Sequence, residues 1–407
     1  MMSKEKRRVP KLRFPGFTKD WEQRELAELC NVYDGTHQTP RYTTSGVMFV
    51  SVENIKTLES DKYISEDDFK NEFKIFPEFG DILLTRIGDV GSANIILDNI
   101  KRAYYVSLAL LKPKGINSLF LLALLSSASV QSEIWRRTLH IAFPKKINKN
   151  EINKVIVNKP SILEQKKIGE LIYALDQIIT LHQRKLDNLK LKKKALLQKL
   201  FPKNGERYPK LRFPGFTDAW EQRKLDDIAK IKTGGGTPKT ANLEYWSGNI
   251  PWIQSSDLVE GDIVHVNINK FINNNALKNS AAKLISRDSI TLVTRVGVGK
   301  VAVINQDFTT SQDFLSLSDF DGNDIKFLAY QLYRLMQENA KVLQGTSIKG
   351  ITKTELIEQS ISIPSSNQEQ NLIANVLSKI DSNITLHQRK LDHLQLQKKA
   401  LLQQMFV

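Results

Sequence analysis

The sequence is poor in the residues that build disulfides and metal sites. Cys30 is its only cysteine, so neither an internal disulfide nor a Cys-based zinc site is possible. Its six histidines show no metal-ligand spacing. No apolar run approaches the roughly 20 residues of a membrane span, and the basic stretch MMSKEKRRVPK at the N-terminus lacks the apolar core of a signal peptide. These absences predict a cytoplasmic protein with no membrane partner.

Length and charge indicate a basic protein of more than one domain. The 407 residues favour two or three domains, and a hydrophobic content of 41% is enough for real cores. Lys and Arg number 59 against 44 Asp and Glu, which gives a formal net charge of +15. This balance favours a polyanionic partner, and nucleic acid before a membrane surface.

The chain contains the same pattern twice. Residues 10–26, PKLRFPGFTKDWEQREL, return at 209–225 as PKLRFPGFTDAWEQRKL, an offset of 199 residues. Residues 179–187, ITLHQRKLD, return unchanged at 384–392, an offset of 205 residues. The sequence therefore predicts two half-length units in tandem with pseudo-two-fold symmetry, an arrangement that suits contact with two places on a DNA duplex.

Each unit ends in a segment that predicts a long helix. Ser161 with Glu164, and Ser366 with Glu369, have the spacing of a capping box, in which the Ser caps an amide and the Glu reaches back. Apolar residues then recur in steps of three and four, which is typical of a coiled-coil seam. The predicted seam comprises Ile168, Leu175, Ile179, His182, Leu186 and Leu189 in the first copy, and Ile373, Ile380, Ile384, His387, Leu391 and Leu394 in the second.

Neither helix can bury such a stripe alone, so we expect the two to pack on each other. They run antiparallel if the two-fold axis crosses them. His182 and His387 interrupt the apolar seam near its middle, and Lys193 and Lys398 fill a second gap. The two histidines either fix the register of the pair or lie along its flank, partly solvated.

The segments that precede the helices combine strand and helix patterns. Runs rich in β-branched residues predict strands at 47–52, 81–88, 289–297 and 301–304, and helices are predicted at 119–137 and 325–342. We therefore expect an α+β fold with two mixed α/β domains and an antiparallel pair of long helices. The predicted boundaries are 1–160 for the first domain, 161–201 for its helix, 202–208 for a linker, 209–364 for the second domain and 365–407 for the C-terminal helix.

The two halves agree at short motifs and diverge between them. Phe49–Ile55 aligns with Trp252–Leu258, and Thr85–Gly88 aligns with Thr294–Gly297. A shared scaffold with unrelated variable segments indicates two domains that do one job on different sequences. Neutral drift of the loops would also spare the scaffold, but drift alone would not explain why the two helices stayed so alike while the domains separated.

In the order and doubling of its motifs, the chain resembles the specificity subunit of a type I restriction–modification system. The motifs are WEQR at Trp21 and Trp220, GTP at Gly236–Pro238, PWIQSSDL at Pro251–Leu258, TR-x-G at Arg86 and Arg295, and GTSIKGI at Gly345–Ile351. The first domain departs from this pattern, because HIAFPKKI at His140–Ile147 replaces GTSIKGI.

The resemblance covers the whole chain and implies a DNA-reading subunit without catalytic residues. Each target-recognition domain would read one half of a bipartite site in double-stranded DNA, and the helix pair would set the gap. The implied partners are two methyltransferase subunits and two restriction subunits in a bacterial cytoplasm. The resemblance places S-adenosylmethionine, ATP and Mg²⁺ on those partners and no cofactor or metal on this chain.

Base-reading residues are expected in polar loops, because side chains specify sequence only by reaching base edges. The candidates are Thr36, His37, Gln38, Arg41, Glu53 and Asn54 in the first domain, and Thr237, Lys239, Gln254, Ser255, Ser256 and Asp257 in the second. Candidates for phosphate contacts are Lys145, Lys146 and Lys349. For Arg86 and Arg295, which align between the halves, a backbone or structural role is favoured, since the two domains should read different bases.

Two other classes of function fit the sequence less well. An adenine methyltransferase would need an NPPY-like string, which does not occur, and GVGK at Gly297–Lys300 lacks the first glycine and the Ser/Thr of a phosphate-binding loop. Asp61 with Glu72 and Lys74 imitates a nuclease set, but such spacing often arises by chance. A coiled-coil adaptor would account for the helices but not for two basic domains.

Overall fold

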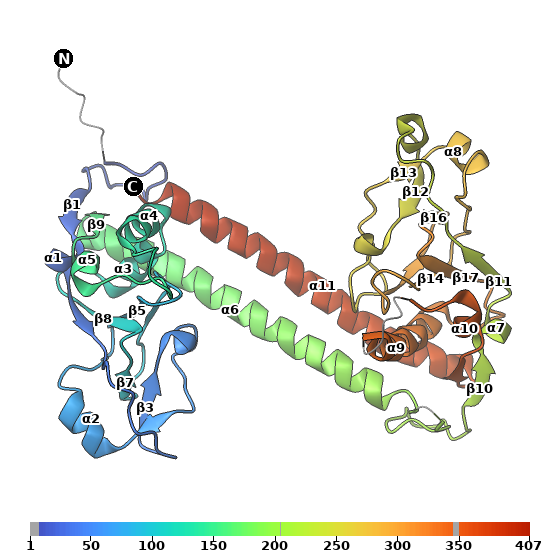
Figure 1. Ribbon diagram of the computed structural model, residues 1–407, viewed down its shortest axis with the longest axis horizontal. Helices are drawn as coiled ribbons and strands as arrows, with labels where there is room; N and C mark the ends of the chain where they lie inside the picture. Colours follow the sequence, from blue (N-terminus) through green and yellow to red (C-terminus); the bar gives the residue numbers. More distant parts are fainter. Residues whose placement is uncertain (1–7, 204, 345–349) are drawn as a thin grey trace. The chain divides into compact units, whose positions relative to one another are not determined.

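The computed structural model describes residues 8–203, 205–344 and 350–407 (Figure 1). The chain divides into two compact units. One consists of Met1–Gln183 together with Arg389–Val407, and the other of Arg184–Gln388. Each unit therefore contains one mixed α/β domain and one part of each long helix, because the division falls within the helices.

The first domain combines strands of three sheets with short helices. Its elements are β1 (Glu22–Glu25), α1 (Leu26–Leu29), β2 (Cys30–Asp34), β3 (Val47–Val50), the 3-10 turn η1 (Val52–Asn54), β4 (Tyr63–Ile64), α2 (Glu66–Glu72), β5 (Ile82–Thr85), β6 (Ala93–Ile95), β7 (Arg102–Tyr104), β8 (Leu108–Pro113), α3 (Ser118–Leu125), α4 (Ala128–Arg137), α5 (Lys149–Asn153) and β9 (Ile156–Lys159). The strands form a four-stranded sheet in the order β2-β8-β5-β6, a three-stranded sheet β4-β3-β7 and the pair β1-β9.

The second domain repeats this topology. Its elements are β10 (Glu221–Lys224), α7 (Leu225–Ile228), β11 (Ile231–Gly234), η2 (Leu243–Trp246), β12 (Ile250–Ile253), η3 (Ser255–Asp257), β13 (Phe271–Ile272), α8 (Asn274–Lys278), β14 (Ser289–Val293), β15 (Val301–Ile304), β16 (Thr309–Thr310), β17 (Phe314–Ser318), α9 (Ile325–Gln344), α10 (Lys353–Ile357) and β18 (Ser360–Ile363). The sheet orders β11-β17-β14-β15 and β13-β12-β16, with the pair β10-β18, match those of the first domain strand for strand.

The central sheet of each domain is buried on both faces. Successive side chains of a strand point to opposite faces, and along β5 the side chains of Ile82 and Leu84 join one core while that of Leu83 joins another. In the second domain Ile290 of β14 joins one core and Val293 the other. This double burial explains why β5, β14 and β15 are continuous apolar runs. Each of the four predicted segments contains a strand, but β3, β5 and β14 end at Val50, Thr85 and Val293, before the predicted ends at 52, 88 and 297.

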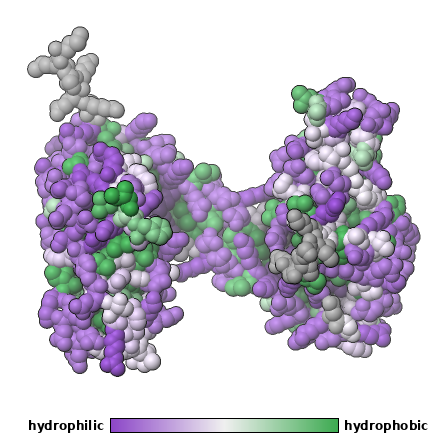
Figure 2. Space-filling model, viewed as in Figure 1, coloured by the Kyte–Doolittle hydropathy of each residue, from purple (hydrophilic) through white to green (hydrophobic). Residues whose placement is uncertain are grey.

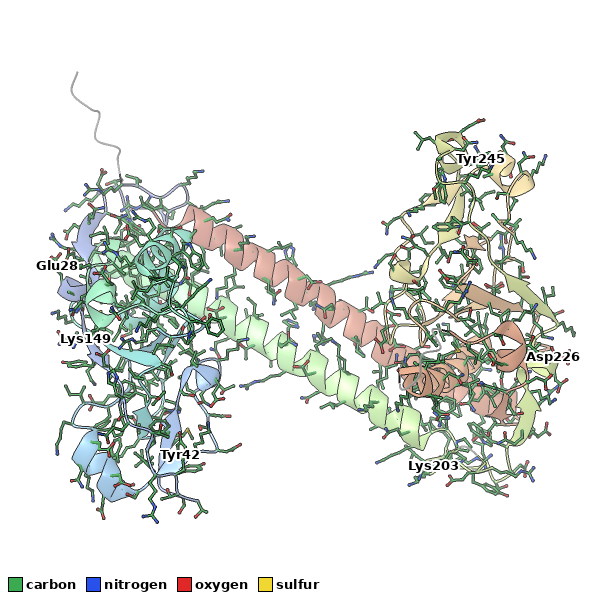
Figure 3. The ribbon with its side chains drawn as sticks, in the orientation of Figure 1. Glu28, Tyr42, Lys149, Lys203, Asp226 and Tyr245 are labelled. Atoms are coloured by element: carbon green, nitrogen blue, oxygen red, sulfur yellow. The ribbon has the colours of Figure 1, made fainter. Side chains whose placement is uncertain are left out.

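The three-stranded sheets form a separate lobe of each domain. Tyr42 marks this lobe in the first domain and Tyr245 in the second (Figure 3). Tyr42 packs edge-on against Phe49 of β3, with ring centroids 5.7 Å apart, and Trp246 packs edge-on against Trp252 of β12 at 5.0 Å. The lobes differ in detail while keeping the same strand order, which is what a shared scaffold with variable loops predicts.

The helix predicted at 119–137 is two helices. α3 ends at Leu125 and α4 begins at Ala128, because Ser127 acts as N-cap and its side chain accepts a hydrogen bond from the amide of Val130 at 3.5 Å. In the second domain the corresponding segment is one helix, α9, as predicted. Serine competes for backbone hydrogen bonds, and this competition ends the first helix early.

The two long helices are α6 (Ile162–Lys199) and α11 (Asn367–Gln404), each of 38 residues. They start where the Ser-x-x-Glu spacing predicts, but the glutamates do not complete a capping box. Arg13 donates to both carboxylate oxygens of Glu164 at 2.6 and 2.8 Å, and Arg212 does the same to Glu369 at 2.8 and 2.9 Å. Each glutamate therefore ties its helix to the repeated PKLRFPGF segment of its own domain.

The helices pair in the antiparallel sense (Figure 1). In one unit Asp176 of α6 pairs with Lys398 of α11 at 2.5 Å, and in the other Lys193 of α6 pairs with Asp381 of α11 at 2.5 Å. The residue number rises along α6 while that of the partner on α11 falls, as in an antiparallel pair. The two lysines are those that interrupt the predicted seam.

The predicted seam residues lie on the inner side of the helices. Every one of them is buried or half-buried, and His182 and His387 are half-buried. The first turns pack elsewhere, because Ile168 joins the core of the first domain and Ile373 that of the second. In each unit the seam therefore begins at the core of the domain.

The C-terminal end of α11 completes the core of the first domain. Phe406 stacks on Phe120 at 5.6 Å and meets Trp21 edge-on at 6.1 Å, and all three rings are buried. The amide of Leu12 donates to the carbonyl of Gln404 at 2.9 Å. The first domain therefore depends on residues nearly 400 positions further along the chain.

The C-terminal end of α6 does the same in the second domain. Phe201 stacks on Phe327 at 5.5 Å and meets Trp220 edge-on at 6.1 Å. The amide of Leu211 donates to the carbonyl of Lys199 at 2.8 Å. Each domain is thus closed by the helix that starts from the other half of the sequence.

The two interhelical ion pairs differ in burial, which predicts unequal effects of removing them. The side chains of Lys193 and Asp381 are 7% and 4% exposed, against 25% and 32% for Lys398 and Asp176. Lys193 also donates to the carbonyl of Gly261 at 2.5 Å. Lys193→Met leaves a buried carboxylate without its cation and should lower the free energy of unfolding by about 3–5 kcal/mol.

The matched control is Lys398→Met, which should cost less than about 1 kcal/mol because its pair stays in contact with water. Urea unfolding of the full chain measures both. Equal losses for the two variants would contradict the assigned difference in burial.

Candidate nucleic-acid interface

In the first domain three loops meet at the end of β5. Arg86, which follows β5, forms an ion pair with Asp34 at the end of β2 and donates through Nε to the carbonyl of Ile147 at 3.2 Å. The amide of Gly88 donates to the carbonyl of Lys145 at 2.8 Å. The variable loop after β2, the TR-x-G turn and the loop at 138–147 are therefore held together.

The loop after β2 is placed by close backbone contacts. The amide of Thr36 donates to the carbonyl of Tyr104 at 3.1 Å. A Cβ atom at Gly35 would lie 2.5 Å from the backbone of Tyr105, so only glycine fits there. The predicted readers beyond it, His37, Gln38 and Arg41, are exposed.

The candidates in η1 differ in availability. The side chain of Asn54 accepts from the amide of Ser51 at 3.0 Å and donates to the carbonyl of Glu59 at 2.7 Å, so it stabilises the turn. Glu53 is exposed and pairs with Lys62 at 2.8 Å. Asn54 is thereby placed as a scaffold residue, and Glu53 remains accessible.

In the second domain the GGG loop, the TR-x-G turn and the start of α10 surround a hollow of about 490 Å³. Gly234, Gly235, Thr294, Arg295 and Gln312 line it. Gln312 accepts a hydrogen bond from Thr237 at 2.6 Å. The predicted readers Thr237 and Lys239 lie in this loop, and Lys349 lies outside the described residues.

The candidates in η3 fall into two groups. Asp257 is buried, and its carboxylate accepts from the amide of Gln254 at 2.9 Å, so it serves the turn. The carbonyl of Ser255 accepts from Lys300 at 2.9 Å. Ser256 is exposed, and Gln254 accepts from Lys270 at 3.1 Å. Asp257 therefore corresponds to Asn54 in role.

The alignment of Arg86 with Arg295 is displaced by one residue in the structure. The amide of Arg86 donates to Ser107, directly before β8, and its carbonyl accepts from Ile147. In the second domain Thr294 occupies this position, because its amide donates to Asp313, directly before β17, and its carbonyl accepts from Ile351.

A shift of one residue in a strand places a side chain on the other face. Arg86 is accordingly 7% exposed and ion-paired, whereas Arg295 is exposed. The structural role predicted for both arginines is therefore supported for Arg86 alone. Arg295 faces solvent beside the hollow.

Sequence reasoning missed the most exposed apolar residues of the first domain. Ile141 and Phe143, in the loop beside the TR-x-G turn, are 99% and 103% exposed. Lys145 and Lys146, the predicted phosphate contacts, follow directly and are exposed. The signal was an apolar stretch between basic residues, HIAFPKK.

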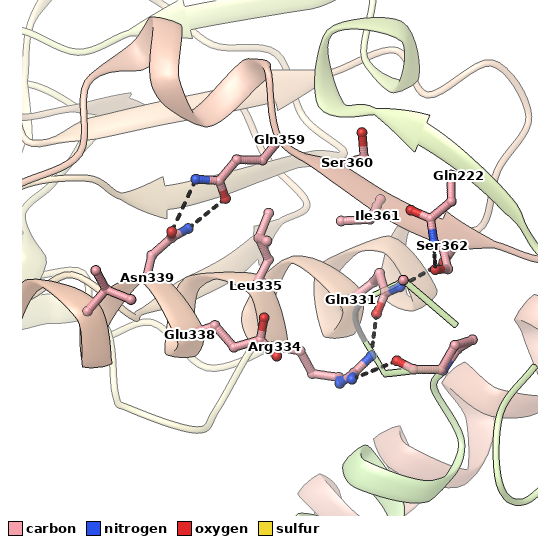
Figure 4. Close-up of a pocket in the computed structure, with 13 residues that line it drawn as sticks. Gln222, Gln331, Arg334, Leu335, Glu338, Asn339, Gln359, Ser360, Ile361 and Ser362 are labelled. Carbon is pink, nitrogen blue, oxygen red and sulfur yellow. Dashed lines mark hydrogen bonds between the residues drawn. The ribbon is translucent and has the colours of Figure 1, made fainter. Parts of the chain in front are cut away.

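Another pocket in the second domain, of about 380 Å³, serves the attachment of α6 (Figure 4). Arg334 of α9 lies against the ring of Phe201 at 5.0 Å and donates to the carbonyl of Pro202 at 3.0 Å and to Gln331 at 2.9 Å. Asn339 and Gln359 exchange two amide hydrogen bonds beside it. This pocket fixes the end of the helix and is separate from the variable loops.

Within 8–203, 205–344 and 350–407, no group of three or more His, Cys, Asp or Glu side chains could hold a metal ion. In the same ranges no single helix is long and apolar enough to cross a membrane. Helices α3 and α4, bent by 67° relative to each other, together match a membrane span in length and composition only.

Two segments of the chain, 18–191 and 217–396, match the family described as type I restriction modification DNA specificity domain. The chain belongs to this specificity family. The two matched segments correspond to the two halves of the repeat, each with its domain and most of its helix. The resemblance carried by the WEQR and TR-x-G motifs is thereby confirmed.

Individual relatives agree with this assignment. The type I restriction enzyme MjaIX specificity subunit of Methanocaldococcus jannaschii is 34% identical over 171 residues, which are 40% of this chain and 38% of that protein. The EcoR124I/EcoR124II specificity subunit of Escherichia coli is 28% identical over 169 residues, 40% of this chain and 41% of that protein. Each match spans less than half of the relative.

The fold is shared over the full length. The crystal structure of a type I restriction–modification S subunit from M. genitalium is similar with a TM-score of 0.70, covering 98% of this chain and 99% of that chain. Its sequence is 13% identical. The two domains with two long helices are therefore the fold of specificity subunits.

The opposite burial of the two arginines predicts opposite effects on stability. Arg86→Ala removes the partner of Asp34 and should lower the free energy of unfolding by about 2–3 kcal/mol. Arg295→Ala should change it by less than about 0.5 kcal/mol, as an exposed substitution does. Urea unfolding of the two variants decides the point, and a large loss for Arg295→Ala would refute the one-residue shift.

Proposed function

We propose that the chain is the sequence-reading subunit of a type I restriction–modification complex and does no chemistry itself. Each domain reads one half of a bipartite site in double-stranded DNA, and the helix pair sets the gap between the halves. Two methyltransferase subunits and two restriction subunits bind to it. S-adenosylmethionine, ATP and Mg²⁺ belong to those partners.

The observation that carries this proposal is the contrast between scaffold and loops. The two domains have the same strand order and the same attachment of helix to core, yet the segments that surround β5 and β14 differ in sequence. Base contacts specify a sequence, whereas the scaffold only positions them. Two domains that share one scaffold but recognise different bases would have the same strand order and different loop sequences.

The length of the helices is compatible with a spacer. At 1.5 Å per residue, 38 residues measure about 57 Å. One turn of B-DNA advances about 34–36 Å. A helix pair of this size exceeds one turn, so it is long enough to separate two readers along a duplex.

Exposed leucines on the two helices are consistent with the binding of two identical partner subunits. Leu181 and Leu191 of α6 are 67% and 65% exposed, and their counterparts Leu386 and Leu396 of α11 are 48% and 66% exposed. Hydrophobic side chains show in green on the helices in Figure 2. Exposed leucines repeated at an offset of 205 fit one protein that binds twice.

Replacement of the first domain tests the reading function. In cells that express the chain with its cognate methyltransferase subunit, methylome sequencing should show adenine methylation in both halves of an interrupted motif. Exchange of residues 1–160 for another recognition domain should alter one half only. Cells without this chain are the control, and a change in both halves would rule out independent readers.

The exposed leucines test the assembly. Leu181→Glu or Leu386→Glu places a charge in one expected interface and should weaken that contact by about 2 kcal/mol or more. Native mass spectrometry should then show one methyltransferase subunit bound in place of two, and none with both changes. Lys190→Gln, a difference that already exists between the two helices, is the matched control and should leave two bound.

A further inference from the structure

The loop between α4 and α5 of the first domain presents two apolar side chains to solvent. Among the described large hydrophobic residues, Ile141 at 99% and Phe143 at 103% are the most exposed, and the next is Leu243 at 81%. Single exposed apolar residues are ordinary on protein surfaces. Two fully exposed ones within three positions form an apolar tip that no described part of the chain covers.

The base of this tip is fixed. The amide of Leu139 donates to the carbonyl of Lys146 at 2.7 Å, and the amide of Ile147 donates to Arg86 at 2.9 Å. His140 lies against the ring of Trp135, with centroids 4.2 Å apart. The nitrogen Nζ of Lys145 lies 4.7 Å from the centroid of the same ring. The tip is therefore carried on a hydrogen-bonded and ring-packed support.

The surroundings of the tip are basic. From Ile134 to Asn150 the chain has two arginines, three lysines and one histidine and no Asp or Glu. Arg136 and Arg137 pair with Glu133, and Arg137 also pairs with Glu151. No ion pair is found for Lys145 or Lys146 within the part of the chain that the structure describes. These two cations beside an apolar tip suit a surface that combines phosphates with stacked rings.

The tip also lies at the candidate interface. Its support is bonded to the TR-x-G turn through the Gly88–Lys145 and Arg86–Ile147 contacts, and Arg86 is paired with Asp34 at the start of the variable loop. Proteins that deform DNA insert apolar side chains such as Phe and Ile between base steps, while cations hold the flanking phosphates. Every element of that arrangement is present here.

We propose that Phe143, assisted by Ile141, inserts between bases within the half-site read by the first domain and unstacks one base step there. Lys145 and Lys146 hold the phosphates on either side. The inference rests on the proposed DNA-reading function and adds a reading of DNA deformability to it.

Only the first half of the sequence contains the apolar tip of Ile141 and Phe143. The aligned segment of the second half, GTSIKGI, has no aromatic residue and no proline. Insertion is therefore expected in one half-site only. The second half-site serves as an internal reference in any experiment on the complex.

The test uses the full chain in complex with its methyltransferase subunits and a duplex that carries the target found by methylome sequencing. 2-Aminopurine replaces one base at a time, outside the adenines that become methylated. Binding of the unaltered complex should raise the fluorescence severalfold at one step of the first half-site. F143A should abolish that rise and weaken target binding by on the order of 10-fold, and F143W should restore both.

The matched control is F79A, because Phe79 is an exposed phenylalanine (65%) of the same domain at the opposite end of β5. It should leave fluorescence and affinity unchanged. Since Phe143 is fully exposed, thermal melting of F143A should match that of the unaltered chain.

Three outcomes overturn the inference. If F143A keeps the full fluorescence rise and the full affinity, the ring stays outside the base stack. If F143A keeps its DNA binding and loses only the binding of the complex to phosphatidylserine vesicles, the tip contacts a membrane surface instead of DNA. Absence of specific DNA binding by the unaltered complex would remove the proposed function as well, and so is distinguishable from failure of the insertion alone.

Discussion

The exchange of helix ends between the two halves is the interaction on which the rest of the structure depends. Phe406 fills the core around Trp21, and Phe201 fills the core around Trp220, with both pairs of rings edge-on at 6.1 Å. A buried aromatic ring contributes several kcal/mol to stability. Neither domain has a complete core without the far end of the other half's helix, so the helices cannot separate from the domains that they connect.

That constraint leaves the loops free to vary. The central sheets are buried on both faces and the helices are anchored at both ends, so substitutions there disturb packing, whereas His37, Arg41 and Arg295 in the loops are exposed. Arg86 and Arg295 illustrate the freedom, because a shift of one residue turns a buried, ion-paired side chain into an exposed one. A protein family that recognises different DNA sequences requires a stable scaffold with loops that tolerate substitution.

The periodic parts of the chain could be predicted and the contact-dependent parts could not. The four strand segments and the two long helices follow from composition and apolar spacing, and the seam residues lie where the spacing puts them. The roles of Glu164, Lys193 and Phe143 could not be predicted. Glu164 binds Arg13 in place of its own helix start, Lys193 is buried against Asp381, and Phe143 is fully exposed. Each role depends on what residues distant in sequence supply or leave uncovered.

The sequence alone determined that the molecule is a doubled unit, basic, with two similar helices and two different sets of loops. It did so because repetition and periodicity are properties of the order of residues. Which residues meet depends on the folded chain: which helix end closes which core, which arginine is buried, and which loop holds an apolar tip beside the TR-x-G turn. Burial and pairing are properties of neighbours in space, and a two-residue period turns a shift of one position into the opposite environment.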